Sequence, residues 1–193
     1  QPVSKSESEV GYYAAAKYEF NDRIFARGSY ERGFRIPNLN EFFGNGIFVA
    51  QNTGLKPETS NNFNLEFGYQ SAPESSVEWG IETNVFFRDT DDLIFLTPVE
   101  VNPRYTNQKS VNTFGFESEV YVTISPKFKF TGNVTKFSQE IREVENVIDN
   151  FLIGTANPNT PDFIAFGRLD FNTSDLFSDG DGFRASLQHY FVE

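Results

Sequence analysis

The sequence predicts an all-β fold, an antiparallel up-and-down sheet whose strands cross a membrane as about eight strands of a transmembrane β-barrel. Apolar and polar residues alternate with a period of two along most of the 193 residues, which is typical of strands with one apolar and one polar face. The links between these strands alternate between short and long, which is the pattern of outer-membrane barrels. The 23 phenylalanines also fit, because aromatic residues favour strands and form girdles at membrane interfaces.

The alternation defines eight strands in chain order. In the third, Phe63, Leu65 and Phe67 share one face, while Asn64 and Glu66 share the other. Several strands reach the roughly ten residues that a tilted strand needs to cross a bilayer. The predicted strands are 11–20, 23–36, 61–71, 77–89, 113–124, 128–140, 162–172 and 182–192. Short links are expected at 21–22, 72–76, 125–127 and 173–181, and long loops at 37–60, 90–112 and 141–161.

Composition excludes several other classes of protein. The mean hydropathy of −0.43 and the lack of any apolar run near ~20 residues exclude a helical membrane protein. A net charge of −11, with 16 basic residues scattered among 27 acidic ones, argues against a nucleic-acid partner. The chain has no cysteine, so neither a disulfide framework nor a thiolate metal site is available.

The link lengths also predict an orientation. If the short turns face the periplasm, the first strand runs inward, the eighth runs outward, and both ends of the set lie on the extracellular side. A complete bacterial barrel normally keeps both termini in the periplasm. We therefore expect residues 1–193 to be one partial β-barrel domain, a fragment of a larger barrel.

Two short strings between the second and third predicted strands resemble a known family. FRIP at 34–37 and LKPE at 55–58 are similar to strings in the barrel of the TonB-dependent outer-membrane transporters. The run at 105–107 followed by a GxExE pattern at 115–119, and the segment 159–161, also look like elements of that family. The residues that carry the resemblance are Phe34, Arg35, Pro37, Leu55, Lys56, Pro57, Glu58, Gly115, Glu117 and Glu119.

The resemblance implies a function that the alternation alone does not. It implies a barrel of about 22 strands in the bacterial outer membrane that imports a scarce nutrient, such as a ferric siderophore or another metal chelate. The implied partners are outer-membrane lipid, that small-molecule ligand, and TonB acting through a plug region with no counterpart in residues 1–193. No cofactor and no resident metal are implied.

Substrate recognition is expected at the extracellular loops and rim. Arg35 and Lys56 have two interpretations there: they attract an anionic chelate, or they pair with glutamates and pin the loop to the wall. The second is expected, because motif residues more often report framework than ligand. Loop aromatics can likewise contact substrate or pack the loops together. The candidate substrate-binding residues are Arg35, Phe42, Phe43, Phe48, Lys56, Arg88, Arg104, Tyr105 and Phe151, and the candidate partners of the two basic residues are Glu41, Glu58 and Glu66.

Other polar residues carry weaker signals. Glu117 and Glu119 could suggest acid–base chemistry, but residues two apart on a strand share a face with many others, so no enzyme is expected. The acidic groups at 89–92 and 179–181 lack the spacing of a calcium loop, and Asp-Gly pairs supply tight turns. Polar residues expected on the lumen face are Arg27, Glu31, Glu66, Glu78, Glu82, Arg88, Glu117, Glu119, Arg168 and Arg184.

Two alternatives remain from the residues alone. A soluble, secreted β-sandwich that binds a ligand or carbohydrate would show the same alternation, but a second sheet would cover its apolar face. A general porin would share the barrel and would lack a plug.

Overall fold

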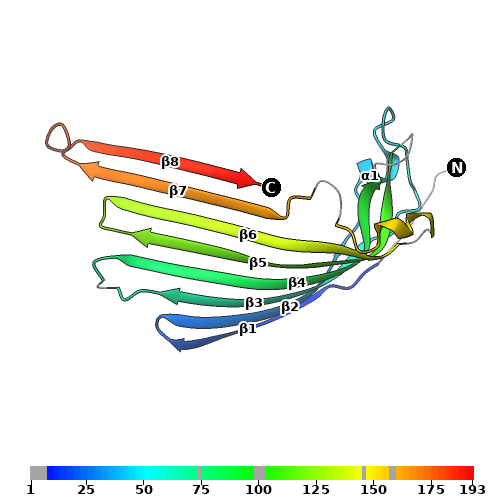
Figure 1. Cartoon of the computed structure of the whole chain (residues 1–193), viewed down its shortest axis with the longest axis horizontal. Coiled ribbons are helices and arrows are strands. Elements are labelled where there is room, and N and C mark those ends of the chain that lie inside the picture. Colours follow the sequence, from blue (N-terminus) through cyan, green and yellow to red (C-terminus); the bar gives the residue numbers. More distant parts are fainter. Residues whose placement is uncertain (1–7, 74, 98–102, 145–146, 157–159) are drawn as a thin grey trace.

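The strands form one antiparallel sheet in which each strand pairs with the next in sequence, as predicted (Figure 1). The computed structural model describes residues 8–193 except 74, 98–102, 145–146 and 157–159. Its strands are β1 (Tyr12–Asn21), β2 (Ile24–Arg35), β3 (Glu58–Gln70), β4 (Glu78–Thr97), β5 (Arg104–Thr123), β6 (Phe128–Glu143), β7 (Phe163–Ser174) and β8 (Gly182–Val192). The sheet is curved, and within the described residues no second sheet packs on either face. The fold is that of a section of barrel wall.

The strand register separates a polar face from an apolar face. Phe63 pairs with Phe87, which pairs with Phe114, and these residues define the apolar face. Arg27 pairs with Glu66 on the polar face. The same ladder places all ten residues predicted for the lumen together on that polar face.

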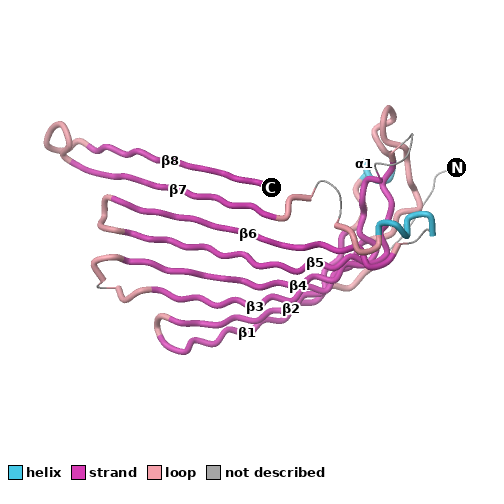
Figure 2. Tube along the Cα trace, in the orientation of Figure 1, coloured by secondary structure: helices cyan, strands magenta, loops and turns pink. Residues whose placement is uncertain are grey.

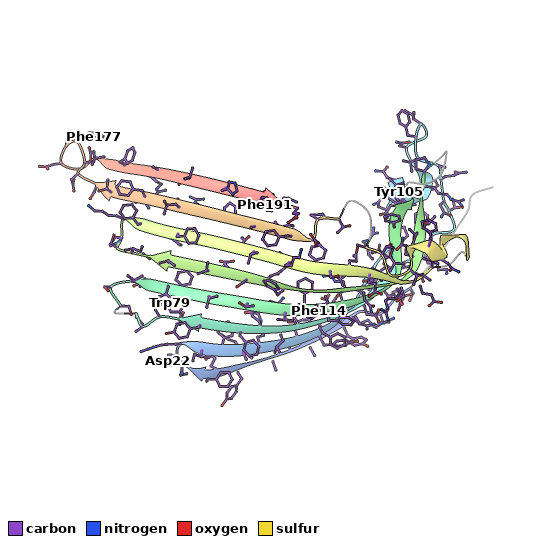
Figure 3. The ribbon with its side chains drawn as sticks, in the orientation of Figure 1. Asp22, Trp79, Tyr105, Phe114, Phe177 and Phe191 are labelled. Carbon is purple, nitrogen blue, oxygen red and sulfur yellow. The ribbon has the colours of Figure 1, made fainter. Side chains whose placement is uncertain are left out.

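Aromatic side chains gather near both ends of the apolar face. Tyr30 and Phe63 lie 4.8 Å apart between ring centroids, toward the end with long loops. Phe128 and Phe171 lie 4.8 Å apart toward the short turns. In Figure 3, Trp79 lies toward the end of the sheet with the short turns, and Phe114 lies toward the end with the long loops. On three strands the two aromatic positions are eight residues apart: Trp79 and Phe87, Phe163 and Phe171, and Phe183 and Phe191.

The prediction of a long loop over 90–112 is wrong. β4 continues to Thr97 and β5 begins at Arg104, so the two strands form an extension beyond the rest of the wall. Asp91 pairs with Ser110 and Leu96 with Tyr105 in a regular ladder. Backbone hydrogen bonds hold this hairpin, and they do not require alternating side chains. Of the loop that remains, residues 98–102 lie outside the described residues.

Helices occupy parts of the other two long loops, at the same end of the sheet (Figure 2). Helix α1 (Leu39–Phe43) follows β2, and β3 begins at Glu58. The 3₁₀-helix η1 (Val147–Leu152) follows β6, which extends to Glu143. Parts of the predicted loop 141–161 and the family segment at 159 lie outside the described residues. No helix in the described part of the chain is long and apolar enough to span a membrane.

The turn between β7 and β8 is organised by its own carboxylates. The Asp181 carboxylate accepts hydrogen bonds from the backbone N–H groups of Leu176, Phe177 and Ser178 at 2.8, 2.8 and 3.0 Å. Asp175 Oδ1 accepts from Gly180 N at 2.7 Å. Across the residues that the structure describes, no group of three or more metal-binding side chains is placed to hold an ion. The acidic residues of this turn therefore act as caps for its backbone.

Acid is expected to loosen this turn. Burial raises the pKa of Asp181, but the hydrogen bonds from Phe177, Leu176 and Ser178 outweigh it and hold that pKa below its ordinary value of 3.8. A group whose folded pKa is depressed stabilises the folded form above its unfolded pKa and loses that effect as the pH falls through its folded pKa. Amide exchange at Leu176 and Phe177, corrected for its intrinsic pH dependence, should therefore accelerate below pH 3.8. D181N should exchange faster at neutral pH and show no such acid transition; the same transition in D181N would contradict the assignment.

Candidate functional site

The loop end of the sheet, which we call the rim, holds the packed core of the described chain. The buried apolar side chains are Leu55, Ile94, Val111 and Ile141, which are 0%, 8%, 1% and 0% exposed. Val111 and Ile141 are cross-strand partners where β5 and β6 reach the rim. Ile94 lies on the β4 extension, and Leu55 lies in the segment that leads into β3. The rim is thus a folded structure at the edge of a single-layer wall.

Arg35 is the centre of an ion-pair network at the rim. It ends β2, and its NH1 donates to both carboxylate oxygens of Glu41 at 2.9 Å. Its Nε and NH2 donate to Glu58 at 2.8 and 2.6 Å. The predicted pairing of Arg35 with Glu41 and Glu58 is therefore confirmed, whereas Glu66 pairs with Arg27 instead.

The two glutamates carry the network into neighbouring segments. Glu41 closes a capping box with Asn38: its Oε2 accepts from Asn38 N at 2.7 Å, and its own N–H donates to Asn38 Oδ1 at 3.0 Å. Glu58 Oε1 accepts from Ile94 N at 2.6 Å, on the β4 extension. Arg35 consequently connects the end of β2 with α1, the start of β3 and the extended hairpin.

The loop after α1 presents apolar side chains to solvent. Asn45 Oδ1 accepts from the backbone N–H groups of Ile47, Phe48 and Val49 at 3.1, 2.8 and 2.9 Å. Ile47 and Phe48 nevertheless remain 79% and 74% exposed. Side-chain capping by asparagine fixes a short loop at low cost. Ile47 was absent from the sequence-based candidates, and its position directly before Phe48 is the signal that could have found it.

The other predicted recognition residues are spread more widely. Phe43 is exposed on α1, with its ring 6.4 Å from that of Phe42, and Phe151 is exposed on η1. Tyr105 lies in β5 at the rim, at the opposite end of the sheet from Phe177 (Figure 3). Arg104 begins the same strand. The structure brings Phe42, Phe43, Phe48, Arg104 and Tyr105 to one end of the sheet.

Two basic candidates are held by neighbouring polar groups. Lys56 Nζ lies 3.7 Å from Asp92 Oδ1 on the β4 extension. Arg88 lies on the polar face of β4, where its Nε donates to Asn62 Oδ1 at 2.8 Å. Both contacts tie strands or loops to one another, but this contact of Lys56 is with an aspartate and not with one of the predicted glutamates.

A neighbouring lysine lowers the pKa of one carboxyl group at the loop end of the sheet. Asp162 immediately precedes β7, and its Oδ2 accepts a hydrogen bond of 2.7 Å from Lys136 Nζ. That bond is the main cause that holds the pKa of Asp162 below its ordinary value. The contact links β6 to the residue that starts β7.

The family-motif residues lie where they support the structure of the sheet and its rim. A Cβ on Gly115 would lie 2.5 Å from Lys136 O and 2.7 Å from Phe86 Cζ, so only glycine fits where β5 passes β6. Pro37 and Pro57 are buried at the two ends of the segment between β2 and β3, residues 36–57, which we call the rim loop. Glu117 and Glu119 extend along the polar face of β5. The motif therefore builds the wall and holds the rim loop.

The comparison with protein families decides the identity of this wall and rim. Residues 1–191 match a family described as TonB dependent receptor-like, beta-barrel. The chain belongs to this family. The comparison with curated protein sequences found no match.

Solved structures of TonB-dependent receptors share the fold. The siderophore receptor PirA from Pseudomonas aeruginosa is 16% identical, with a TM-score of 0.64 over 94% of this chain and 30% of PirA. The ferric yersiniabactin uptake receptor FyuA from Yersinia pestis is 18% identical, with a TM-score of 0.64 over 93% of this chain and 25% of FyuA. The copper transporter OprC is 15% identical, with a TM-score of 0.65 over 93% of this chain and 26% of OprC. The chain thus spans less than a third of the length of these structures.

Proposed function

We propose that this chain forms part of the barrel wall and the recognition rim of an outer-membrane receptor that imports a scarce nutrient. The match to the TonB-dependent receptor family over residues 1–191 carries the proposal. The transported ligand would be a small metal chelate such as a ferric siderophore, since the structural neighbours include a siderophore receptor and a ferric yersiniabactin uptake receptor. In this proposal the apolar face contacts outer-membrane lipid. TonB acts through a plug region outside residues 1–193.

The rim is the part of the described chain best suited to ligand contact. It exposes Phe43, Ile47 and Phe48 on a backbone that Asn38 and Asn45 hold in place. Exposed aromatic residues on a fixed scaffold are favourable binding anchors, because little ordering entropy remains to be lost on binding. Arg35 and Lys56 lie beside carboxylates, so we assign them to the scaffold. We therefore assign the exposed Phe43, Phe48 and Phe151 to ligand contact, and Arg35 and Lys56 to the scaffold of the rim.

The sandwich alternative is not favoured. A soluble β-sandwich would cover its apolar face with a second sheet, whereas the described strands form one sheet and the family is a barrel family. Receptors of this family are transporters, and we propose no catalytic step for this chain.

Substitution of the displayed aromatics should weaken ligand capture. In the full-length protein, F48A and F43A should each lower affinity for the transported chelate by roughly tenfold, since burying a phenylalanine contributes about 1.5–3 kcal/mol. The measurement is accumulation and surface binding of labelled ferric chelates in iron-limited cells, with and without TonB. F177A is the matched control, because Phe177 is 83% exposed at the opposite end of the sheet.

Two outcomes would contradict this proposal. Accumulation of the chelate that does not depend on TonB would contradict energised import. Equal losses of affinity in F48A and F177A would show that the rim is not the recognition surface.

A further inference from the structure

Asn107 joins the rim loop to the β4–β5 extension through three hydrogen bonds. Its Oδ1 accepts from Lys56 N at 3.0 Å, and its Nδ2 donates to Lys56 O at 3.1 Å. The same Nδ2 donates to Asp92 O at 2.6 Å. One side-chain amide therefore pairs with both backbone groups of Lys56, in the way that a neighbouring strand would, and also holds the facing strand.

Only an amide side chain at this position provides all three bonds. Two of them need a donor and one needs an acceptor, and asparagine supplies both from one short group. Asp92 has a positive φ of 54°, a conformation that aspartate tolerates better than most residues. Its side chain lies 3.7 Å from Lys56 Nζ, which adds an ionic contact to the same junction.

Further contacts between the same two segments reinforce the junction. Asn52 Nδ2 donates to Tyr105 O at 2.8 Å, and Ala50 N donates to Pro103 O at 2.9 Å. Ala50 also forms a parallel bridge with Arg104. The rim loop is thus bonded to residues 103–107, where β5 begins.

We propose that Asn107 is a positioning residue that makes the rim loop, residues 36–57, and the β4–β5 extension a single recognition body. This inference rests on the proposed function only in treating the rim as the recognition surface. Asn107 itself touches backbone, and it acts through Lys56 and Asp92. It fixes where Phe48, on the loop, sits relative to Tyr105, on the hairpin.

The physical consequence is a surface that is formed before the ligand arrives. Loops that must order on binding lose affinity to the entropy of ordering, whereas a preformed surface avoids that loss. Without Asn107, the loop would keep its own Asn45 cap and the contacts of Ala50 and Asn52, but it would lose the three bonds that hold its Lys56 end against the hairpin. The effect would then fall on the relative position of two segments that each remain folded.

Distance measurements between spin labels test this directly and need no ligand. The 193 residues contain no cysteine, so labels can be placed at I47C on the loop and L96C on the hairpin of the full-length protein, after replacing any cysteine elsewhere in it. Both sites are exposed, at 79% and 37%. The parent protein should give one narrow distance distribution. N107A, which loses three bonds, and N107D, which loses both donors, should each give a broad one.

A second readout follows the backbone of the junction itself. The Lys56 amide should exchange roughly tenfold faster in N107A, because a net contribution of one ordinary hydrogen bond changes a local opening equilibrium by about that factor. N133A is the matched control, since Asn133 is an exposed asparagine on the polar face of β6. Folding of the barrel is checked in parallel by its heat-modifiable electrophoretic shift.

The outcomes separate a positioning role from a structural one. Broad distances with an intact barrel would support the inference, whether or not the ligand of the receptor is a metal chelate. Narrow distances in both N107A and N107D would overturn it. Failure of both variants to form a barrel would assign Asn107 to the wall and also overturn it.

Discussion

R35M is expected to release residues 36–57 from the end of β2 while the barrel wall stays folded. The substitution leaves Glu41 and Glu58 without their shared cation, and their side chains are only 9% and 12% exposed. Removing one partner of a buried ion pair leaves uncompensated charge in a poorly solvated place. The expected local loss is about 2–3 kcal/mol, less than for a fully buried pair, because the Arg35 side chain is itself 43% exposed.

Proteolysis and amide exchange of the rim loop would measure this release. A double substitution, R35M with E41Q, should recover part of the protection, because it removes one of the two stranded charges. R184M is the control, since Arg184 lies on the polar face of β8 and donates to Asn172 rather than to a carboxylate. If the double variant is no better protected from proteolysis and amide exchange than R35M, burial of unpaired charge is not the cause of the release.

G115A is expected to destabilise the wall itself. The added Cβ would lie 2.5 Å from both Lys136 O and Phe137 Cβ, and backbone cannot move aside as a side-chain tip can. The strands β5 and β6 must therefore shift apart locally, at a cost of about 1–3 kcal/mol. The folded fraction and the denaturant midpoint should both fall.

G28A is the matched control for this prediction. Gly28 lies within β2, and a Cβ there would meet nothing within 4 Å. The heat-modifiable fraction of the two variants, refolded side by side in detergent, makes the comparison. Equal folded fractions of G115A and G28A would show that β5 and β6 accommodate the added Cβ without loss of stability.

The sheet could be predicted from sequence because its signal is local. Alternation along each strand fixed both the strand and its two faces, and the register then placed Glu82 beside Glu119 and Phe63 beside Phe87 as that pattern requires. The alternation of short turns with long loops predicted the up-and-down order of the strands. The strand extensions escaped prediction because polar residues such as Asp91 and Ser110 pair through their backbones, which hydropathy does not report.

The rim site was only partly predictable, for a different reason. The motif strings pointed to Arg35 and Lys56, and pairing with glutamates was the favoured interpretation. The role of Asn107 was invisible, because its partner Lys56 is 51 residues away and is bound through backbone atoms. A side chain that binds backbone leaves no complementary residue type in the sequence.

The eight-residue spacing of aromatics on β4, β7 and β8 sets a length for the apolar band. Eight residues of strand span about 26 Å, and a tilt near 40° reduces this to about 20 Å along the membrane normal. A typical bilayer has a hydrocarbon core of about 30 Å, and the bacterial outer membrane is thinner than average. If the apolar face contacts outer-membrane lipid, as we propose, the wall would fit short acyl chains, and the lipids around it would have to compress in a thicker bilayer.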